Sequence, residues 1–578
     1  MIKLLKGLKP YKISVVLILF FTCIQTLAEL LLPTLMSDIV DFGIVREDTF
    51  YIAKIGIIML VIAAIGAMGA ILTTLLSAKT GNGFARNLRK RIFIKIENYS
   101  LKEFDEKGTS SLITRTTNDV TQIQSFIVMM LRLFVRAPLM AIGGIFMAIN
   151  KNPKLSLIII FTVIVLGILI GIVASKIIPM FKLIQDKIDN LNRILRERLT
   201  GIRVIRAFNK INHEKARFNG ASEELKNTTI RVNKIMAGLS PLLMLILNFT
   251  TIFIIWFGSF KINSGGMEVG DLMAFIQYVS QIMFSLIMLT MVFIMVPRAS
   301  ASAARINEVL DVDLDIVDPI QSIETNVERG CIEFNDVSFR YNGAEGLALK
   351  NISFKIKPGE VTAIIGGTGS GKSTLVNLIS RFYDVSSGSI LIDGVDVRDM
   401  TGEYLRKKIG LVPQKAVLFS GTINDNIRFG KEDAKKEEII NSCKTAQAHD
   451  FIYAMKDKYD SEISQGGTNI SGGQKQRLSI ARALVKKPEI YIFDDSFSAL
   501  DFKTDAKLRE ALKKETIDNT VLVVAQRVTT VMNADKIIVL DEGSIVGIGT
   551  HKELLNSSEI YKQIVLSQLS EKALNSNI

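Results

Sequence analysis

Cysteine is nearly absent from this chain, whose 578 residues contain only Cys23, Cys331 and Cys443. The three lie far apart and form none of the short spacings that metal-binding cysteines use. This scarcity excludes a disulfide-stapled scaffold and a cysteine-based metal site, and it indicates three ordinary reduced thiols.

Charge is missing from long stretches of the first half, although charged residues make up 22% of the whole chain. Apolar residues reach 48% and the mean hydropathy is +0.31, which is high for a soluble protein. Six apolar runs of about 20 residues or more can each cross a bilayer as a helix. They are Ile13–Leu35, Ile52–Ser77, Ser125–Ala148, Leu155–Ile178, Ile235–Phe260 and Leu272–Val296. The first run is too long for a signal-peptide core and lacks a small-residue cleavage site, so we interpret it as a membrane span.

The basic excess is placed as membrane topology requires. A net charge of +13 would suit a nucleic-acid partner, but much of it flanks the apolar runs, so we expect a lipid bilayer and no nucleic acid. The connection after the first run is short and acidic, whereas the connections after the second and fourth are long and basic. By the positive-inside rule, we expect both termini and both long connections to face the cytoplasm in a multi-pass protein of the cell membrane.

The long connections keep a helical pattern, which predicts that the spans extend as helices below the membrane. Within them, Ser111–Val120 and the stretch from Gly201–Phe208 to His213–Asn219 are natural docking elements for a neighbouring domain. The sequence leaves open that both are solvated charged turns. It also leaves open whether Met1–Lys12 forms a helix on the membrane surface or a frayed basic tail.

Ionisable residues inside the spans are few, namely Glu29 in the first and Arg132 and Arg136 in the third. A charge within a span is a functional candidate by default. We expect the two arginines to lie near the membrane surface with their heads in water, because the third helix starts deep in the cytoplasm. For Glu29, the sequence leaves open whether the carboxylate has a function or simply lies near the membrane surface.

The second half reads differently, as alternating short strands and helices. We expect a membrane domain over 1–305, a linker over 306–330 and an α/β domain over 331–578. The α/β domain carries a phosphate-binding loop between the apolar run Val361–Ile365 and a helical run, Leu375–Ile379. Its residues are Gly366, Gly367, Thr368, Gly369, Ser370, Gly371, Lys372, Ser373 and Thr374. Lys372 should reach the outer phosphates of a nucleotide, and the Ser373 hydroxyl should ligate Mg²⁺.

Further nucleotide-site candidates follow the same order as the chain. Tyr341 precedes the loop and could stack on adenine, while Gln414 follows a strand and could contact Mg²⁺ or water. Ser471, Gly472, Gly473 and Gln474 open a helix whose N-terminus favours phosphate. Asp494 ends the strand Ile490–Asp494, where a metal-side carboxylate is expected. Asp501 follows Ser498-Ala499-Leu500, and Gln526 comes last, after the strand Val521–Val524.

Together these features resemble the ATP-binding cassette family over almost the whole chain. Six spans fused ahead of one cassette are similar to a half-transporter of the type IV exporter fold. The resemblance implies ATP and Mg²⁺ as cofactors, with Ser373, Gln414 and Asp494 on the metal. It also implies that two cassettes close head to tail, so that each ATP lies between one P-loop and the other subunit's Ser-Gly-Gly-Gln helix.

The chain departs from the family pattern at three positions. Asp495 stands where the family has the glutamate that polarises the attacking water, Gln526 stands where it has histidine, and Gln465 replaces a glutamate ahead of the signature. The shorter carboxylate retreats by roughly an ångström, a misplacement that can slow a reaction about a hundredfold. Glutamine cannot carry the charge or shuttle the proton that histidine can. The expected catalytic residues Asp495, Gln526 and Gln414 thus form a weak hydrolytic site.

These departures lead to the hypothesis that the chain is the degenerate-site half of a heterodimeric bacterial multidrug exporter. A non-identical half-transporter would carry Glu and His, and this chain's signature would complete that partner's faster site. A homodimer with two slow sites is the alternative. Apolar spans favour an amphipathic or hydrophobic small-molecule substrate such as a drug or lipid, with peptide export second. We expect no peptidase extension for processing peptides. An ATP-gated channel or regulatory sensor also stays open, whereas six fused spans exclude a soluble repair or translation ATPase.

Overall fold

The computed structural model describes residues 1–324 and 330–568. Within these ranges, six helical segments are long and apolar enough to cross a membrane, as the sequence predicts. The chain separates into two compact units, one formed by residues 1–97 and 108–312 and the other by 98–107 and 313–578. The boundary after residue 312 follows the end of a helix that continues well past the last predicted span.

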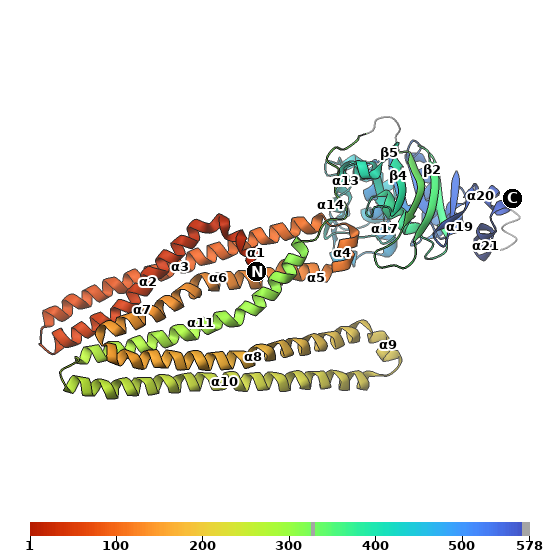
Figure 1. The fold of residues 1–578 in the computed structure, drawn as a ribbon. Coiled ribbons are helices and arrows are strands. Elements are labelled where there is room, and N and C mark those ends of the chain that lie inside the picture. The colour runs from red at the N-terminus through yellow and green to blue at the C-terminus, as the bar shows by residue number, and fades with distance from the viewer. Residues whose placement is uncertain (325–329, 569–578) are drawn as a thin grey trace. The chain divides into compact units, whose positions relative to one another are not determined.

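The membrane unit consists almost entirely of helices (Figure 1). Its short N-terminal elements are α1 (Ile2–Leu5) and η1 (Lys6–Tyr11). The first two spans are α2 (Lys12–Asp38) and α3 (Thr49–Glu97), joined through η2 (Ile39–Ile44). The third is a chain of short pieces: α5 (Thr109–Thr114), η3 (Arg115–Asp119), α6 (Val120–Met129), η4 (Met130–Phe134) and α7 (Val135–Lys151). The last three are α8 (Pro153–Thr200), α10 (Ile211–Asn263) and α11 (Val269–Leu310), with α9 (Ile202–Ala207) between α8 and α10.

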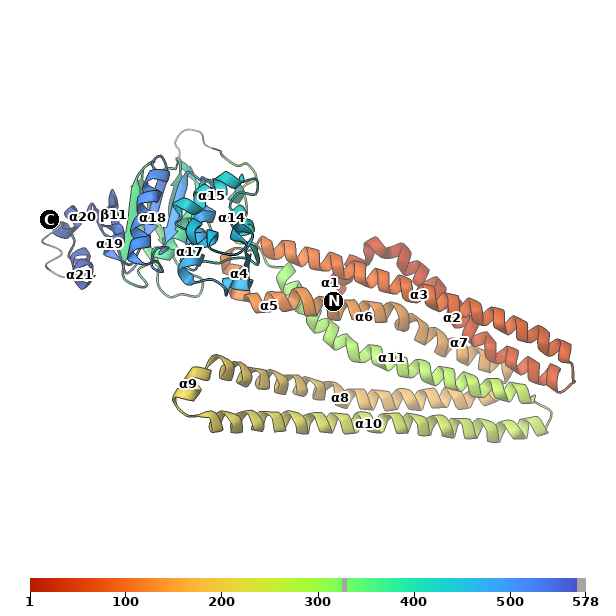
Figure 2. The same cartoon turned by 180° about the vertical axis from the view of Figure 1, so that it is seen from behind.

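Helices α8 and α10 run side by side as a long antiparallel pair joined by α9, in both the front and the back view (Figures 1 and 2). Their length confirms that the spans continue as helices beyond a bilayer thickness, since a helix rises about 1.5 Å per residue. The predicted docking element at Gly201–Phe208 is largely the helix α9, none of whose residues is buried.

The first predicted docking element, Ser111–Val120, lies in the membrane unit, and its docking role stays a prediction. Residues 111–120 belong to the membrane unit, where Asp119 is fully buried and bonded by Arg305 and Ser302 of α11. The segment that belongs to the second unit is α4 (Leu101–Lys107), just before it. The Oε1 atom of Glu103 accepts the Asp315 backbone N–H at 2.9 Å, and Lys102 pairs with the Asp315 carboxylate at 2.5 Å. The sequence missed α4 because its charged surface looks like an ordinary solvated turn.

Two further expectations for the membrane unit meet different outcomes. Met1–Lys12 is helical, with Leu4 buried, rather than a frayed tail. Arg132 is exposed. The guanidinium of Arg136 does not contact water alone, because it bonds both carboxylate oxygens of Glu29 at 2.8 Å.

The second unit contains two main sheets. The larger has the order β12-β11-β3-β10-β9-β6, with parallel pairing except between β11 and β12. Its strands are β3 (Val361–Gly366), β6 (Ile409–Val412), β9 (Ile490–Asp494), β10 (Thr520–Val524), β11 (Lys536–Asp541) and β12 (Ser544–Gly549). The smaller is antiparallel, in the order β2-β1-β4-β5, with β1 (Ile332–Phe339), β2 (Leu349–Ile356), β4 (Ser387–Ile392) and β5 (Val395–Asp396). A short ribbon pairs β7 (Gly421–Thr422) with β8 (Glu462–Ile463).

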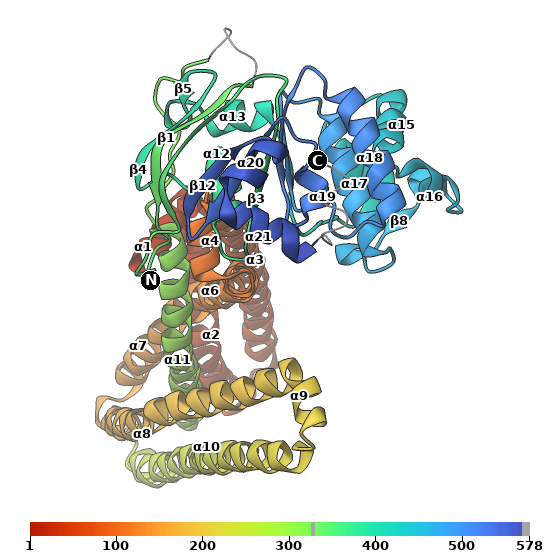
Figure 3. The same cartoon turned by 90° about the vertical axis from the view of Figure 1, so that its right-hand side faces the viewer.

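Helices between and after the strands complete an α/β fold, as the sequence predicts. They are α12 (Lys372–Ile379), α13 (Gly402–Lys408), α14 (Ile423–Arg428), α15 (Lys436–Thr445), α16 (His449–Tyr453), α17 (Gly472–Val485), α18 (Phe502–Glu515), α19 (Val528–Val531), α20 (His551–Ser557) and α21 (Glu559–Gln568). Single turns η5 (Val397–Asp399), η6 (Lys458–Asp460) and η7 (Gln465–Gly467) link them. Helices α15, α17 and α18 gather on one side of this unit (Figure 3).

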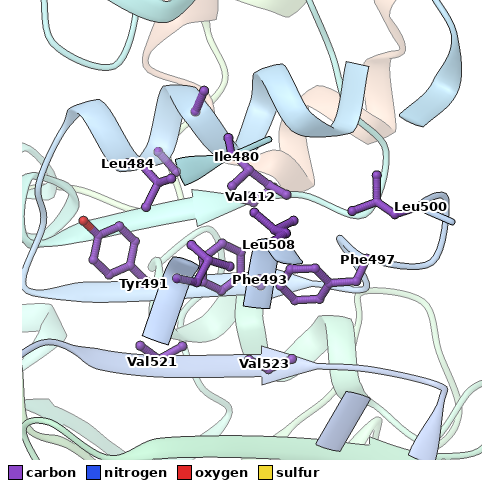
Figure 4. Packing of buried hydrophobic residues seen from close by; sticks show 14 of the residues in the cluster. Val412, Ile480, Leu484, Tyr491, Phe493, Phe497, Leu500, Leu508, Val521 and Val523 are labelled. Carbon is purple, nitrogen blue, oxygen red and sulfur yellow. The ribbon is translucent and has the colours of Figure 1, made fainter. Parts of the chain in front are cut away.

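The core of this unit has two apolar clusters, one of which lies between the larger sheet and helices such as α17 and α18. Ile480 and Leu484 of α17 point toward Val412 of β6 and the aromatic residues of β9 (Figure 4). β-branched and aromatic residues fill β9 and β10 because both faces of a central parallel strand are buried. This packing fixes the strand ends, where the candidate site lies.

Candidate nucleotide-binding site

Several of the predicted site residues lie at the carboxyl ends of four neighbouring parallel strands. Asp494 of β9 lies opposite Val524 of β10, and Val524 lies opposite Ile364 of β3. The loop after β3, Asp495 after β9, Gln526 after β10 and Gln414 after β6 therefore leave the sheet at one edge. Ligands of open α/β sheets bind at this edge.

The loop after β3 has the backbone that a phosphate cradle needs. Gly369 and Gly371 adopt φ of +85° and +99°, a region that residues with a side chain avoid. A Cβ on Gly366 would lie 2.1 Å from the Leu540 carbonyl oxygen, so the strand end admits no side chain there. Helix α12 then starts at Lys372, and its N-terminal N–H groups favour an anion.

Lys372 is held inside this loop. Its Nζ donates to the carbonyl oxygens of Gly366 at 2.8 Å and Gly367 at 2.6 Å and to the Ser370 hydroxyl at 3.2 Å. Burial lowers the pKa of the ammonium, and the nearby Asp495 and Asp494 carboxylates oppose that shift. A buried cation that rests mainly on neutral oxygens is suited to an incoming phosphate.

Asp494 and Ser373 lie together beside the loop. The Ser373 hydroxyl is hydrogen-bonded to the Asp494 carboxylate, whose pKa is raised by burial. A carboxylate and a hydroxyl next to a phosphate cradle are the hard oxygen donors that Mg²⁺ prefers. The residues present thus fit this metal.

Asp495 sits in a constrained backbone position. Its φ is +47°, unusual for a residue with a side chain, and its N–H donates to the Val524 carbonyl at 2.8 Å. Gln414 Nε2 donates to its Oδ2 atom at a long 3.4 Å. Burial raises the pKa of Asp495, while that bond and the positive charge of Arg527 oppose the shift. The structure thus brings together Gln414, Asp495, Asp494 and Lys372.

The loop carrying Gln526 is held by a residue that the sequence analysis did not single out. The Gln568 side chain donates to the Gln526 carbonyl at 2.8 Å and accepts the Val528 N–H at 2.8 Å. Between these bonds, Arg527 donates to the Ser498 carbonyl at 3.2 Å. The Gln526 side chain itself is exposed. No sequence signal pointed to Gln568, because it lies about 40 residues downstream on α21.

Tyr341 lies beside the loop rather than far from it. Its hydroxyl is 3.0 Å from the Thr374 hydroxyl, and its ring meets the Tyr383 ring edge-on at 5.4 Å between centroids. Tyr383 donates in turn to Asp105 of α4 at 3.4 Å, and burial raises its pKa to about 12, so the hydroxyl keeps its proton. Tyr383 is a second residue the sequence reading missed, although an aromatic shortly after a P-loop helix is a usable signal.

The Ser471–Gln474 segment forms a separate N-terminus. Ser471 caps α17, with its hydroxyl accepting the Gln474 N–H at 3.3 Å while the Gln474 side chain accepts the Ser471 N–H at 2.9 Å. Gly472 has open space where a Cβ would stand. Gln465 lies in the turn η7 just before it, and Asp501 caps α18 by accepting the Thr504 N–H at 2.9 Å. These residues bond within their own caps rather than to the P-loop.

Comparison with family models identifies both units. Residues 15–286 match the model for the ABC transporter transmembrane region, and residues 349–498 match the ABC transporter model. The second range contains the P-loop, Gln414, the Ser471–Gln474 segment and Asp494.

Similar proteins extend the match over the whole chain. The chain is 40% identical to the uncharacterized ABC transporter ATP-binding protein YfiB of Bacillus subtilis, covering 99% of this chain and 100% of that one. It is 33% identical to an ATP-dependent lipid A-core flippase of Desulfotalea psychrophila, covering 96% of each. The solved structure of a bacterial Atm1-family ABC exporter with ATP bound superposes with a TM-score of 0.81 at 26% identity, covering 98% of this chain and 99% of that one. The chain therefore belongs to the ABC transporter family, as a half-transporter whose membrane domain is fused to an ATPase domain coupled to transport.

Proposed function

We propose that the protein exports amphipathic or hydrophobic compounds across the cell membrane, driven by ATP. The apolar spans, with few charges, support such a substrate class. Relatives support it by name: one is a lipid A-core flippase, and a Bacillus subtilis relative at 32% identity is a putative multidrug export protein. The basic long connections support an arrangement with both termini and the ATPase domain in the cytoplasm.

In this proposal, Lys372 and the glycine-rich backbone hold the outer phosphates, and Ser373, Asp494 and Gln414 hold Mg²⁺. When bound, the metal neutralises phosphate charge and orients the nucleotide. Tyr341 provides an aromatic face near the loop for the base. Asp501 and the Ser471–Gln474 segment contribute at the facing site of a dimer.

We further propose that this chain's own site holds ATP and hydrolyses it slowly. The observation that carries this proposal is the identity of two residues. Asp495, directly after β9, has a shorter side chain than glutamate, and Gln526 carries no charge. The Asp495 carboxylate is one methylene short, and its contact with Gln414 is long at 3.4 Å. Gln526 can donate a hydrogen bond but cannot gain a proton.

An intact Ser471–Gln474 cap beside a weak hydrolytic pair is the reason to propose a non-identical partner half-transporter. That partner would carry Glu and His at the two positions, and its site would use this chain's Ser471–Gln474 segment. The cap geometry and the open space at Gly472 support such a use. A homodimer with two slow sites is the competing assembly.

The test is the ATP turnover of the purified full-length chain in lipid vesicles, without any other subunit. We expect ATP binding to be ordinary and turnover to be about a hundredfold below that of the D495E/Q526H variant. Brisk turnover by the unaltered chain alone would contradict the slow-site proposal. ATP-dependent accumulation of a fluorescent amphiphile in inverted vesicles, once the partner is added, tests export. Conductance in planar bilayers without stoichiometric uptake would instead show a channel.

A further inference from the structure

We propose that Glu29 and Arg136 form the headgroup site of a cavity that binds a zwitterionic amphiphile, one carrying an ammonium and an anionic group on an apolar tail. This proposal rests on the proposed export function and names its substrate class. Three features support it: the geometry of the ion pair, the cavity beside the pair and the depth of the pair in the membrane unit.

The ion pair is built, with support on both sides. Arg136 Nη2 lies 2.8 Å from each carboxylate oxygen of Glu29. Gln25, one turn away on α2, donates to Glu29 Oε1 at 3.0 Å, and Gln281 of α11 donates to the Glu29 backbone carbonyl at 3.1 Å. Gln25 and Arg136 thus hold the Glu29 carboxylate, while α11 holds the backbone of Glu29.

The pair opens onto a cavity of about 430 Å³ formed by α2, α7 with the preceding η4, and α11. Apart from the pair, its walls are mainly apolar, with Leu32, Leu133, Met140, Phe284 and Met288 among them. The side chains of Glu29 and Arg136 remain 29% and 37% exposed, so the pair can be reached from the cavity. A cavity of this size suits an apolar tail beside a charged head.

The pair lies deep in the membrane unit. Asp38, Lys151 and Asp271 mark one end of the spans, where Lys151 bonds Asp271 at 2.7 Å. Glu29 lies about 14 Å along α2 from Asp38, and Arg136 about 22 Å along α7 from Lys151, at ~1.5 Å per residue. In a hydrocarbon layer about 30 Å thick, Glu29 therefore lies near the middle, and Arg136 lies within the layer, far from the end that Lys151 marks.

This depth selects the charge of the ligand. A purely cationic or anionic ligand that took one partner would leave the other as an unpaired charge within the membrane unit, which is unfavourable. A zwitterion can pair its ammonium with Glu29 and its anionic group with Arg136, so no charge is left alone. Gln281 also lines the cavity and adds a polar side chain to its wall.

The test measures binding of four radiolabelled dodecyl probes to the full chain in micelles of a sugar-headed nonionic detergent. The probes are dodecylphosphoethanolamine (zwitterionic), dodecylammonium, dodecyl methyl phosphate and dodecanol. We expect the zwitterion to bind at least about tenfold more tightly than the other three. Each of E29Q and R136Q should remove that preference, and the exchanged pair E29R/R136E should restore it at least in part. R132Q, which alters an exposed arginine one turn away, is the matched control and should leave it unchanged.

Equal affinity for all four probes, or tighter binding of a singly charged probe, would overturn the proposal. So would an R136Q variant that keeps the preference. ATP binding measured on each variant shows that the chain is folded, and the exchanged pair keeps the test open if a single variant fails to fold. Normal zwitterion preference without ATP-dependent uptake would leave this site standing while the export function failed.

Discussion

Asp495 and Gln526 are the residues on which the account of slow hydrolysis depends, and both are readable from the sequence alone. Their position could be anticipated because strand patterns and motif order place them after β9 and β10. Their surroundings could not. The positive φ of Asp495, its contact with Gln414 and the clamp by Gln568 arise from residues brought together by the fold.

The pH dependence of the residual turnover reports on the Asp495 carboxylate. Burial raises the pKa of Asp495, so the group loses its charge at a higher pH than an ordinary aspartate as the solution is acidified. The Gln414 bond stabilises the charged form, and Q414A should therefore raise that pKa further. We expect the acid limb of the turnover profile of the chain alone to move to higher pH in Q414A. K415A, at the exposed neighbouring position, is the control. A limb that stays in place would mean that Asp495 does not act as the base.

Lys372 offers a second test at this scale, of binding rather than hydrolysis. Among the described residues, its ammonium has neutral loop oxygens as hydrogen-bond partners, so K372A removes the side-chain cation that would meet the phosphates. We expect nucleotide affinity to fall by at least about tenfold, the effect of ~1.4 kcal/mol, measured by equilibrium binding of a fluorescent ATP analogue. K350A, which alters a lysine exposed on β2, should bind as the unaltered chain does.

At the scale of elements, the strands and long helices follow their hydrophobic pattern, and the sequence predicts them well. Helix α4, by contrast, is not predicted, because it is as polar as the residues that follow it. What distinguishes α4 is a set of tertiary contacts within the second unit. Glu103 and Lys102 bond Asp315, and Asp105 accepts a hydrogen bond from Tyr383. Such contacts leave no periodic signal in the sequence.

Gln568 of α21 holds the loop of residues 525–528, which carries Gln526, in place. Q568A removes the bonds to the Gln526 carbonyl and the Val528 N–H, each worth about 1 kcal/mol, and should loosen residues 525–528. We expect turnover to fall severalfold with little change in KM, and hydrogen exchange of this loop to rise. Q568E keeps the acceptor for Val528 but loses the donor to Gln526, so it should lie between. S567A is the control. Unchanged hydrogen exchange of residues 525–528 in Q568A would contradict this role of Gln568.

A buried ion pair stabilises the join between the two sheets. Lys408 bonds Asp393 and Glu489 at 2.8 Å each, and Asp393 also accepts the Gly330 and Cys331 N–H groups. Although burial alone would lower it, the pKa of Lys408 is raised by these carboxylates, so the lysine stays charged at neutral pH and this stability is lost only at strongly basic pH. D393N keeps the acceptor but removes the charge, and because Lys408 keeps Glu489, it should destabilise the second unit by about 1–3 kcal/mol.

The measurement for D393N is pulse proteolysis of the full chain in urea. D396N is the matched control, because the Asp396–Arg398 pair is partly exposed and worth at most about 1 kcal/mol. Equal midpoints for the two variants would show that the Asp393 pair contributes no more than a surface pair.

At the scale of the whole molecule, the sequence predicts a six-span membrane domain followed by an α/β ATPase domain, and both are confirmed. The division into two units could not be read from composition, because residues 98–107 leave one unit and join the other. The Glu29–Arg136 pair was equally hidden, since the residues lie on different spans and their pairing depends on helix packing.

The assembly proposed here requires an unlike partner only if the chain's own site is slow for the reasons given. The most direct measurement is therefore steady-state ATP turnover of vesicles containing this chain alone, compared between the unaltered protein and D495E/Q526H at equal nucleotide occupancy. The account predicts slow turnover that rises about a hundredfold in the variant with ATP affinity unchanged. Brisk turnover by the unaltered chain, or no rise in the variant, would contradict it.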